Sequence, residues 1–153
     1  MLLIKKIIFW YKRCIWKIRS YILRLVWSSV GKNFKYNSSI MDQSSLDKLK
    51  IWDDCWIWTW SVINAYNWIN IWKNVLISDY CAIISTDHEY KDINIPISEQ
   101  WYTIWKEQEI NIWDWVWIWF NAVIMKWVTI WNNSIIWAWS VVTKDVDSNS
   151  IYA

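Results

Sequence analysis

Residues 110–146 read INIWDWVWIWFNAVIMKWVTIWNNSIIWAWSVVTKDV, and an aliphatic residue returns at every sixth position of this stretch. The aliphatic positions are Ile112, Ile118, Ile124, Ile130, Ile136 and Val142. Four residues after each of them lies a small or aliphatic residue: Val116, Ala122, Val128, Ser134, Ser140 and Val146. A period of six fits neither the turn of an α-helix nor a heptad. It predicts a parallel β-helix, in which each hexad forms one strand and one corner and three hexads complete a coil.

A second array with the same period lies earlier in the chain. Its inward aliphatic positions are Ile51, Ile57, Ile63, Ile71, Ile77 and Ile83, with a shift of two residues after Ile63. Its fourth positions are Cys55, Ser61, Asn67, Val75, Cys81 and Asp87. Between the two arrays, residues 87–110 break the period and contain Pro96, the only proline. We therefore expect an all-β fold with one loop, about residues 87–110, extruded from the coil, and loops on rigid scaffolds commonly carry function.

The composition limits the possible function classes. The chain has 153 residues, 56% of them hydrophobic, and a formal net charge of +2. This length suits one domain with a sizeable core, and this charge balance excludes a disordered chain and a strongly basic nucleic-acid-binding surface. Three cysteines form no CxxC pair and there is one histidine, so neither a disulfide framework nor a Cys/His zinc cluster is expected. A reduced, cytoplasmic location is the resulting expectation.

The N-terminal segment carries seven cations and no acid: Lys5, Lys6, Lys12, Arg13, Lys17, Arg19 and Arg24. Its apolar residues recur at helical spacing, which predicts an amphipathic helix over residues 3–27. Charges interrupt every apolar run, so the pattern is neither that of a signal peptide nor that of a transmembrane span. The helix has two interpretations, a cap on the core or peripheral attachment to anionic lipid at the inner membrane face. The predicted division is a helical segment at 1–30 and a β-helix domain at 45–153.

The chain contains 19 tryptophans and one glycine, and the tryptophans of the hexads avoid the inward positions. Seven directly follow an inward aliphatic residue: Trp52, Trp58, Trp72, Trp113, Trp119, Trp131 and Trp137. Four lie at the third position (Trp60, Trp115, Trp127, Trp139) and three at the fifth (Trp56, Trp68, Trp117). A large apolar side chain is normally buried, whereas a tight corner favours glycine. The placement of these tryptophans is therefore the reverse of the usual one.

The stretch quoted first resembles the hexapeptide-repeat acyltransferases, whose C-terminal coils read like IGDxVWIGxNxVIxxGVTIGxxxxIGAGSVVTKD. Each Trp of residues 110–146 lies at a Gly or Gly-like turn position of that family, except Trp117, which matches the family's own Trp. The preceding ISTDHEYKDINIPISEQ resembles the DHxx…PIxxQG loop of the sugar O-acetyltransferase branch, the maltose, galactoside and lipopolysaccharide O-acetyltransferases, with Trp101 at the Gly. The resemblance covers about residues 45–153 and implies a left-handed parallel β-helix.

One hypothesis explains the exchange of Gly for Trp. Some bacterial lineages decode UGA as glycine and others as tryptophan, so a wrong decoding table would convert UGA-encoded glycine to tryptophan and leave a GGN-encoded residue such as Gly31 unchanged. The alternative is a genuine Trp-rich β-helix with outward indole ladders. It requires Trp at corners that favour positive φ, at a cost of order 1 kcal/mol or more each, and large exposed apolar patches. The literal sequence is still expected to form the coil, with the indoles pointing outward.

The resemblance also implies a reaction. His88, the only histidine, would take the proton from an acceptor hydroxyl, which then attacks the thioester of acetyl-CoA directly. Asp87 or Glu89 could orient the imidazole ring, as the carboxylate of a catalytic triad does. Asn64 and Asn67, one coil earlier, could bind acceptor hydroxyls, although corner asparagines are more often turn formers.

The acetyl-CoA site implied by the family lies on the outer face of the C-terminal coils, between the subunits of a homotrimer. Trp117 would line the acyl-transfer cleft and Phe120 would follow it beside the pantetheine chain, although Phe120 departs from the small or polar residue that is common there. Ala138 and Ser140 would offer backbone contacts. Thr143 and Lys144 would lie near the adenosine phosphates, where a lysine is physically suitable. No metal is expected.

The leading hypothesis is therefore an acetyl-CoA-dependent O-acetyltransferase that acts on a sugar of a surface polysaccharide or lipopolysaccharide. An amino-sugar N-acetyltransferase is the nearest alternative. A catalytically silent β-helix used for assembly is an alternative of a different class. The three-histidine zinc site of γ-carbonic-anhydrase-like coils cannot form within a chain that has one histidine.

Overall fold

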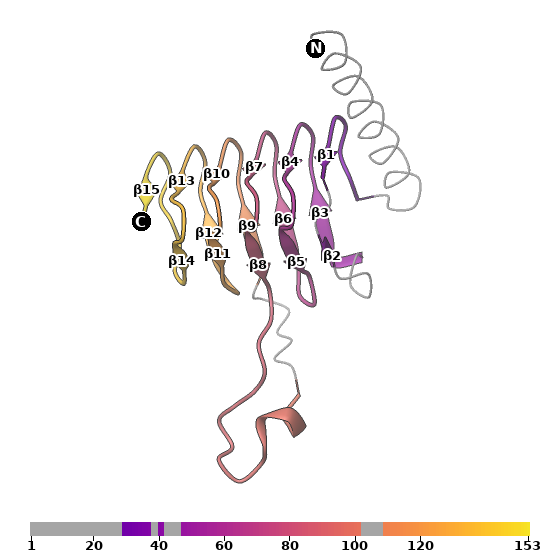
Figure 1. The fold of residues 1–153 in the computed structure, drawn as a ribbon, viewed down its shortest axis with the longest axis vertical. Coiled ribbons are helices and arrows are strands. Elements are labelled where there is room, and N and C mark those ends of the chain that lie inside the picture. The colour runs from indigo at the N-terminus through magenta and orange to yellow at the C-terminus, as the bar shows by residue number, and fades with distance from the viewer. Residues whose placement is uncertain (1–28, 38–39, 42–46, 102–108) are drawn as a thin grey trace, which may run out of the picture.

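The computed structural model describes residues 29–37, 40–41, 47–101 and 109–153, which form a parallel β-helix of three sheets around one core (Figure 1). The β10 sheet contains β1 (Lys35–Tyr36), β4 (Trp56–Ile57), β7 (Leu76–Ile77), β10 (Trp117–Ile118), β13 (Ile135–Ile136) and β15 (Ile151–Tyr152). The β8 sheet contains β14 (Val141–Val142), β11 (Val123–Ile124), β8 (Ala82–Ile84), β5 (Val62–Asn64) and β2 (Ile40–Met41). The β9 sheet contains β12 (Thr129–Ile130), β9 (Ile110–Ile112), β6 (Ile69–Ile71) and β3 (Leu49–Ile51).

The register of the sheets follows the hexads. Each inner strand pairs in parallel with the strand one coil before and the strand one coil after, so Ile77, Ile118 and Ile136 are neighbours in the β10 sheet. The β8 and β9 sheets follow the same rule. Parallel strands need crossover connections, and here each hexad passes to the next sheet until the third returns the chain to the first. The period of six is thereby confirmed as the repeat of the fold.

The core is a column made of the inward residues of both arrays. Its aliphatic members are Ile51, Ile57, Ile63, Ile71, Ile77, Ile83, Ile112, Ile118, Ile124, Ile130, Ile136 and Val142. The fourth-position residues are buried beside them, except Asp87, which is exposed because the chain has already left the coil there. Fully burying an isoleucine side chain contributes ~1.5–3 kcal/mol. The stacked column is therefore the main source of stability.

The third position of a hexad turns the corner with a left-handed backbone. Positive φ angles between 55° and 70° occur at Asn33, Asp54, Trp60, Asn74, Tyr80, Trp115, Asn121, Trp127, Asn133, Trp139 and Asn149. Asn and Asp tolerate this region, whereas a bulky side chain there is strained by ~1–2 kcal/mol. All four third-position tryptophans therefore occupy corners that favour glycine.

The tryptophans that directly follow inward residues form a ladder on the outside of the coil. The rings of Trp52 and Trp72 stack at 4.1 Å between centroids, those of Trp72 and Trp113 at 4.6 Å, and those of Trp113 and Trp131 at 5.4 Å. The literal sequence thus forms the coil with outward indoles, as expected. Within the described residues, the buried indole N–H groups of Trp72 and Trp113 find no acceptor. An unsatisfied buried donor costs ~1–3 kcal/mol.

The coil begins nearer the N-terminus than the boundary predicted at residue 45. Val30 bridges Ile51 and β1 pairs with β4, so residues 29–37 already belong to the coil. The sequence signal is weak there because Phe34, rather than a small residue, fills the fourth position. The helix predicted over residues 3–27 lies outside the described residues. In the part of the chain that is described, no helix combines the length and apolar character that crossing a membrane needs.

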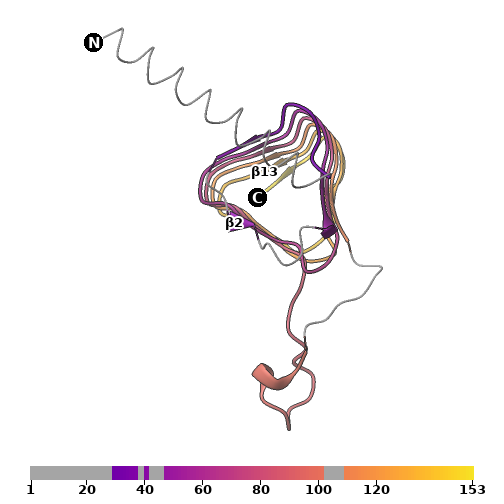
Figure 2. The same ribbon diagram turned by 90° about the vertical axis from the view of Figure 1, so that its right-hand side faces the viewer.

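One loop leaves the coil between β8 and β9, and we call residues 85–109 the arm. Figure 2 shows the three-sided cross-section of the coil, with β13 on one side and the arm leaving the opposite corner. The described part of the arm contains one turn of 3-10 helix, Ile97–Glu99, which begins after Pro96. The extruded loop predicted at about residues 87–110 is confirmed.

Candidate active site

From β5 onward, four stretches of the chain turn from the β8 sheet to the β9 sheet at one corner of the coil, which we call the arm corner. They are residues 65–68, 85–109, 125–128 and 143–145. The second stretch is the arm, and the others lie one coil before it, one coil after it and two coils after it. Residues that are distant in the sequence therefore approach each other along this corner.

His88 lies half-buried at the base of the arm. Its Nδ1 atom is 3.1 Å from the carbonyl oxygen of Gln100, on the returning side of the arm. A carbonyl oxygen can only accept, so this hydrogen bond places a proton on Nδ1, and the neutral ring then carries its lone pair on Nε2. The backbone N–H of Glu89 donates to the carbonyl oxygen of Trp101 at 3.0 Å, which bonds the two sides of the arm beside the ring. The arrangement provides the tautomer that a general base needs.

Asp87 binds the backbone beside the ring. Its Oδ1 atom accepts a hydrogen bond from the backbone N–H of His88 at 2.8 Å, and its Oδ2 atom lies 3.3 Å from Nζ of Lys126. Glu89 accepts hydrogen bonds from the next two backbone N–H groups. The folded arm brings the carbonyl of Gln100 to Nδ1 of the ring, and orientation of the imidazole by Asp87 or Glu89 stays a prediction.

Gln100 connects the fold of the arm to the ring. Its side chain is buried, and its Nε2 atom donates to the carbonyl oxygens of Asp92 and Ile95, both at 2.8 Å. Its Oε1 atom is buried without a donor from the described residues. One residue therefore closes the arm through its side chain and contacts His88 through its backbone.

The two asparagines predicted to bind the acceptor lie at the arm corner, one coil before His88. Asn64 is half-buried, and its Oδ1 atom accepts from the backbone N–H of Tyr66 at 3.3 Å, a contact that forms a turn. Asn67 is 2% exposed and occupies an inward fourth position of the coil. In this conformation Asn67 does not reach the outer surface, so its side chain fits the structural interpretation better than the binding one.

The positions predicted for acetyl-CoA fall into two groups. Thr143 and Lys144 are exposed and lie at the arm corner, two coils beyond His88. Trp117 lies in the β10 sheet, the side of the coil opposite that corner (Figure 2). There its Nε1 atom donates to Oγ of Ser78 at 3.2 Å.

The remaining three predicted positions belong to the second group. Phe120, Ala138 and Ser140 lie at the corner between the β10 and β8 sheets. The ring of Phe120 packs edge-on against Tyr80 at 5.6 Å and Trp139 at 6.1 Å. Ser140 is buried. Ser140 and Thr143 flank the two-residue strand β14, so these two groups adjoin at the last coil, whereas Trp117 lies on the β10 side.

The described cysteines are structural. Cys55 and Cys81 are buried free thiols. Burial raises the pKa of Cys55 from 9.0 to about 12 and that of Cys81 from 9.0 to about 11, against the opposing effect of backbone hydrogen bonds. Near neutral pH neither provides a thiolate nucleophile. The described residues also contain no group of three or more His, Cys, Asp or Glu side chains that could hold a metal ion.

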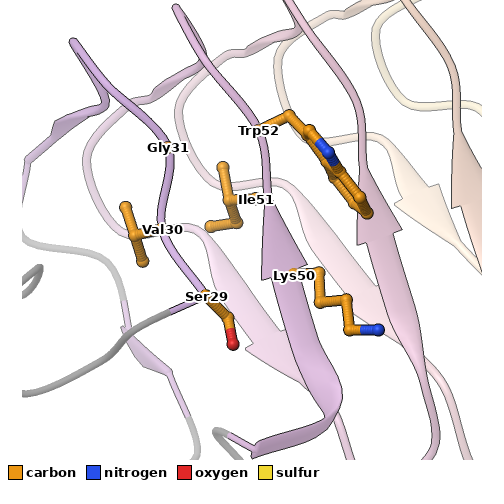
Figure 3. Close-up of a pocket in the computed structure, with 6 residues that line it drawn as sticks. All are labelled: Ser29, Val30, Gly31, Lys50, Ile51 and Trp52. Atoms are coloured by element: carbon orange, nitrogen blue, oxygen red, sulfur yellow. The ribbon is translucent and has the colours of Figure 1, made fainter.

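A pocket of about 310 Å³ lies between the first two coils (Figure 3). It is lined by Ser29, Val30, Gly31, Lys50, Ile51 and Trp52. A Cβ atom at Gly31 would meet the backbone of Trp52 and Asp53, so only glycine fits this close approach of two coils. The pocket contains none of the predicted site residues and is not assigned to the site.

Comparison with solved structures identifies proteins of the same fold. A maltose O-acetyltransferase from Clostridium difficile 630 matches with a TM-score of 0.77 and 26% identity, over 89% of this chain and 70% of that one. A hexapeptide-repeat-containing acetyltransferase from Vibrio cholerae O1 biovar eltor, complexed with acetyl coenzyme A, matches with a TM-score of 0.76 and 24% identity, over 88% of this chain and 70% of that one. The chain has the fold of these acetyltransferases. No family model and no curated protein sequence matches it.

A more distant match has the same architecture. A mutant N-acyltransferase from Bacillus cereus, in complex with dTDP-4-amino-4,6-dideoxyglucose and coenzyme A, matches with a TM-score of 0.56 and 16% identity, over 87% of this chain and 82% of that one. The structural neighbours are thus acyl-transferring enzymes, and two of them hold acetyl coenzyme A or coenzyme A. The predicted relation to hexapeptide-repeat acetyltransferases is confirmed at the level of the fold.

Two residues of the site are absent from the set predicted by sequence. Gln100 belongs to the PISEQ motif that carries the resemblance, and this motif could have identified it. Lys126 has no comparable signal. Only the stacking of residues 125–128 against the base of the arm brings it to Asp87.

Proposed function

We propose that this protein is an acetyl-CoA-dependent O-acetyltransferase that transfers the acetyl group to a sugar hydroxyl. The observation that carries the proposal is the ring of His88 at the base of the arm, held by the carbonyl of Gln100 with the proton on Nδ1. The comparisons support it, because a maltose O-acetyltransferase and an acetyltransferase complexed with acetyl coenzyme A share the fold. The DHEY and PISEQ motifs, which resemble the sugar O-acetyltransferase branch, support the same acceptor class.

In the proposed reaction, Nε2 of His88 takes the proton of the acceptor hydroxyl while the hydroxyl oxygen attacks the thioester carbonyl. The new C–O bond forms, the C–S bond breaks, and the leaving coenzyme A thiolate takes the proton from the imidazolium. Direct transfer requires no nucleophilic side chain. This agrees with the raised pKa values of the buried thiols of Cys55 and Cys81.

We propose that the site is shared between subunits of a homotrimer built from left-handed coils. His88, Thr143 and Lys144 lie at the arm corner, whereas Trp117 lies on the opposite side of the coil. Two copies of the chain would enclose one acetyl-CoA molecule if one contributed the arm corner and the other contributed Trp117. The arm also exposes large apolar side chains, which an assembly would cover. Light scattering tests this directly, and a monomer at assay concentration would overturn the shared site.

The experiment that tests the function supplies acetyl-CoA and a panel of sugars to the purified protein. We expect release of the coenzyme A thiol that depends on the sugar, and a product heavier by one acetyl group in mass spectrometry. The panel pairs each sugar with its amino analogue, because the N-acyltransferase fold match keeps amine acceptors under consideration. Product from amines alone would favour N-acetylation. The absence of product with every acceptor would overturn the proposed function and favour a catalytically silent assembly protein.

We also propose that most corner tryptophans are glycines in the cellular protein, encoded by UGA. Four of them, Trp60, Trp115, Trp127 and Trp139, have the positive φ that favours glycine. Gly31, the one glycine in the printed sequence, lies where a Cβ atom would collide with the next coil. Reading the codons in the source DNA tests this. UGA at the corners and UGG at Trp117 is the expected result, whereas UGG throughout would mean that the indoles are real.

We propose a cytoplasmic location with contact to the inner membrane face through the basic N-terminal segment. The seven cations of residues 1–27, without an acid among them, support attraction to anionic lipid. Sedimentation with vesicles tests this attachment. Binding to anionic vesicles and not to neutral ones is expected, and equal recovery in the supernatant with both would favour the cap interpretation.

A further inference from the structure

A lysine from one coil meets a carboxylate at the base of the arm. Nζ of Lys126 lies 3.3 Å from Oδ2 of Asp87, and the Lys126 side chain is 17% exposed while that of Asp87 is 46% exposed. The cation also lies 4.4 Å from the centroid of the Trp127 ring. The aliphatic stem of Lys126 is thus covered by the coil, and its charged end points to the arm.

The strand register explains why these two residues meet. β8 and β11 pair in parallel with Ala82 opposite Val123 and Ile83 opposite Ile124. The residues that follow the two strands are therefore stacked at the arm corner, where one chain continues into the arm and the other completes its turn. Lys126 belongs to the continuing coil, so its backbone is held by the strands on both sides.

The contact extends from Lys126 to the backbone of the proposed base. Asp87 uses Oδ2 for Lys126 and Oδ1 for the backbone N–H of His88, at 2.8 Å. The carbonyl of Gln100, which contacts the ring of this histidine at Nδ1, belongs to the arm itself. Of these two contacts, only the one through Asp87 connects the base of the arm to the neighbouring coil.

The returning end of the arm has a separate attachment. Nδ2 of Asn70 donates to Oε2 of Glu109 at 2.7 Å and to Oδ1 of Asn111 at 3.0 Å. This cluster fixes the arm where it rejoins the β9 sheet, at the opposite end of the arm from Asp87. The two attachments can therefore be removed separately.

We propose that Lys126 is a positioning residue for His88, acting through Asp87 to hold the imidazole where it accepts the acceptor proton. This inference rests on the proposed function. A partly exposed ion pair contributes little to global stability, so its loss is expected to act on geometry rather than on folding. A small displacement of a catalytic group lowers the rate of the chemical step far more than it lowers binding.

The test measures the kinetics of Lys126→Met, which keeps the apolar stem and removes the charge. We expect kcat to fall by about tenfold or more, with an unchanged KM for acetyl-CoA and an unchanged melting temperature. Lys126→Arg keeps a cation within reach of Asp87 and should restore most of the lost kcat. Lys73→Met, at an exposed lysine of another corner, is the matched control and should leave kcat unchanged.

Asp87→Asn provides a second, independent test. If Lys126 acts through Asp87, the double variant should lose no more kcat than the more damaged single variant. Should Lys126→Met fail to fold, two other variants still test the positioning role. Asp87→Asn should lower kcat at unchanged KM, and Lys126→Arg should keep the wild-type kcat.

The failure of this inference can be separated from the failure of the proposed function. A wild-type protein without transfer activity, or full activity in a His88→Ala variant, overturns the proposed function and this inference with it. An active, His88-dependent enzyme whose Lys126→Met variant keeps its kcat overturns the positioning role alone. A loss that Lys126→Arg does not restore also overturns it, because packing of the stem would then be responsible.

Discussion

The coil and the arm are stabilised in different ways. The coil repeats one device, a buried aliphatic residue stacked on its counterparts in the neighbouring coils, as Ile118 stacks between Ile77 and Ile136. The described part of the arm buries little and is held by single polar contacts, chiefly those of Gln100, while Ile93 is 93% exposed. The buried column that stabilises the fold and the proposed catalytic base therefore lie in different parts of the molecule. The coil supplies a rigid frame, and the arm carries the one histidine.

The largest expected effect is on activity and comes from the arm. His88→Ala removes the proposed base, and we expect a loss of about 10²–10⁴-fold in kcat with an unchanged melting temperature, because the side chain belongs to no buried column. Steady-state kinetics beside a thermal melt measure both quantities. Substantial turnover in this variant would contradict the assignment of His88 as the base. The arm would then no longer differ from the coil by carrying the catalytic group.

The next effect is on stability and comes from the coil. Ile118 is fully buried, so Ile118→Ala should lower the free energy of unfolding by about 2–5 kcal/mol. Its matched control is Ile93→Ala in the arm, for which we expect a change within about 0.5 kcal/mol. Denaturant titrations of both variants provide the measurement. Equal losses would mean that the arm packs against something that covers Ile93.

A smaller effect separates two tryptophans of the same hexad. Trp115 has φ 65° and is 64% exposed, so Trp115→Gly should raise the free energy of unfolding by about 1 kcal/mol through relief of backbone strain. Trp113 lacks a positive φ and stacks between Trp72 and Trp131, so Trp113→Gly should bring no such gain. Parallel thermal melts compare the two. A stabilisation by Trp113→Gly that matches or exceeds that of Trp115→Gly would remove backbone strain as the reason.

The smallest effect near neutral pH concerns the buried thiols of the coil. The pKa values of Cys55 and Cys81 rise from 9.0 to about 12 and about 11, so the unfolded chain releases these protons first as the pH increases. The thiols therefore leave stability unchanged below about pH 9 and lower it between pH 9 and about 12. Alkylation of a Cys14→Ser variant at pH 8 should be slow when folded and fast in denaturant. Rapid labelling of the folded protein would show that these corners open.

The coil could be predicted from the sequence because its signal is repeated. Each hexad places an aliphatic residue and a small residue at fixed positions. An irregular hexad can therefore be aligned from the regular hexads beside it, and the inward residues of the core column could be predicted one by one. The hexad pattern is weaker at residues 29–37, because the large side chain of Phe34 fills a fourth position that elsewhere holds a small residue. The start of the coil at these residues could therefore not be predicted from the sequence.

The site could be predicted only in part, because contacts across the arm are not periodic. The motif identifies His88, but the ring of His88 contacts the backbone carbonyl of Gln100. Every residue has a backbone carbonyl, so the residue types in the sequence do not indicate this contact. Residue type alone makes Asn67 a candidate for acceptor binding, whereas its inward fourth position in the hexad indicates a buried side chain, as the structure shows. Lys126 depends on which corners are stacked, which follows from the register and not from any local pattern.

The decisive experiment is a structure of the protein with acetyl-CoA bound. We expect the thioester carbonyl beside Nε2 of His88, between the arm corner of one subunit and the β10 sheet of its neighbour, with Lys126 still paired to Asp87. Acetyl-CoA bound away from the arm corner, or held entirely by one chain, would contradict it.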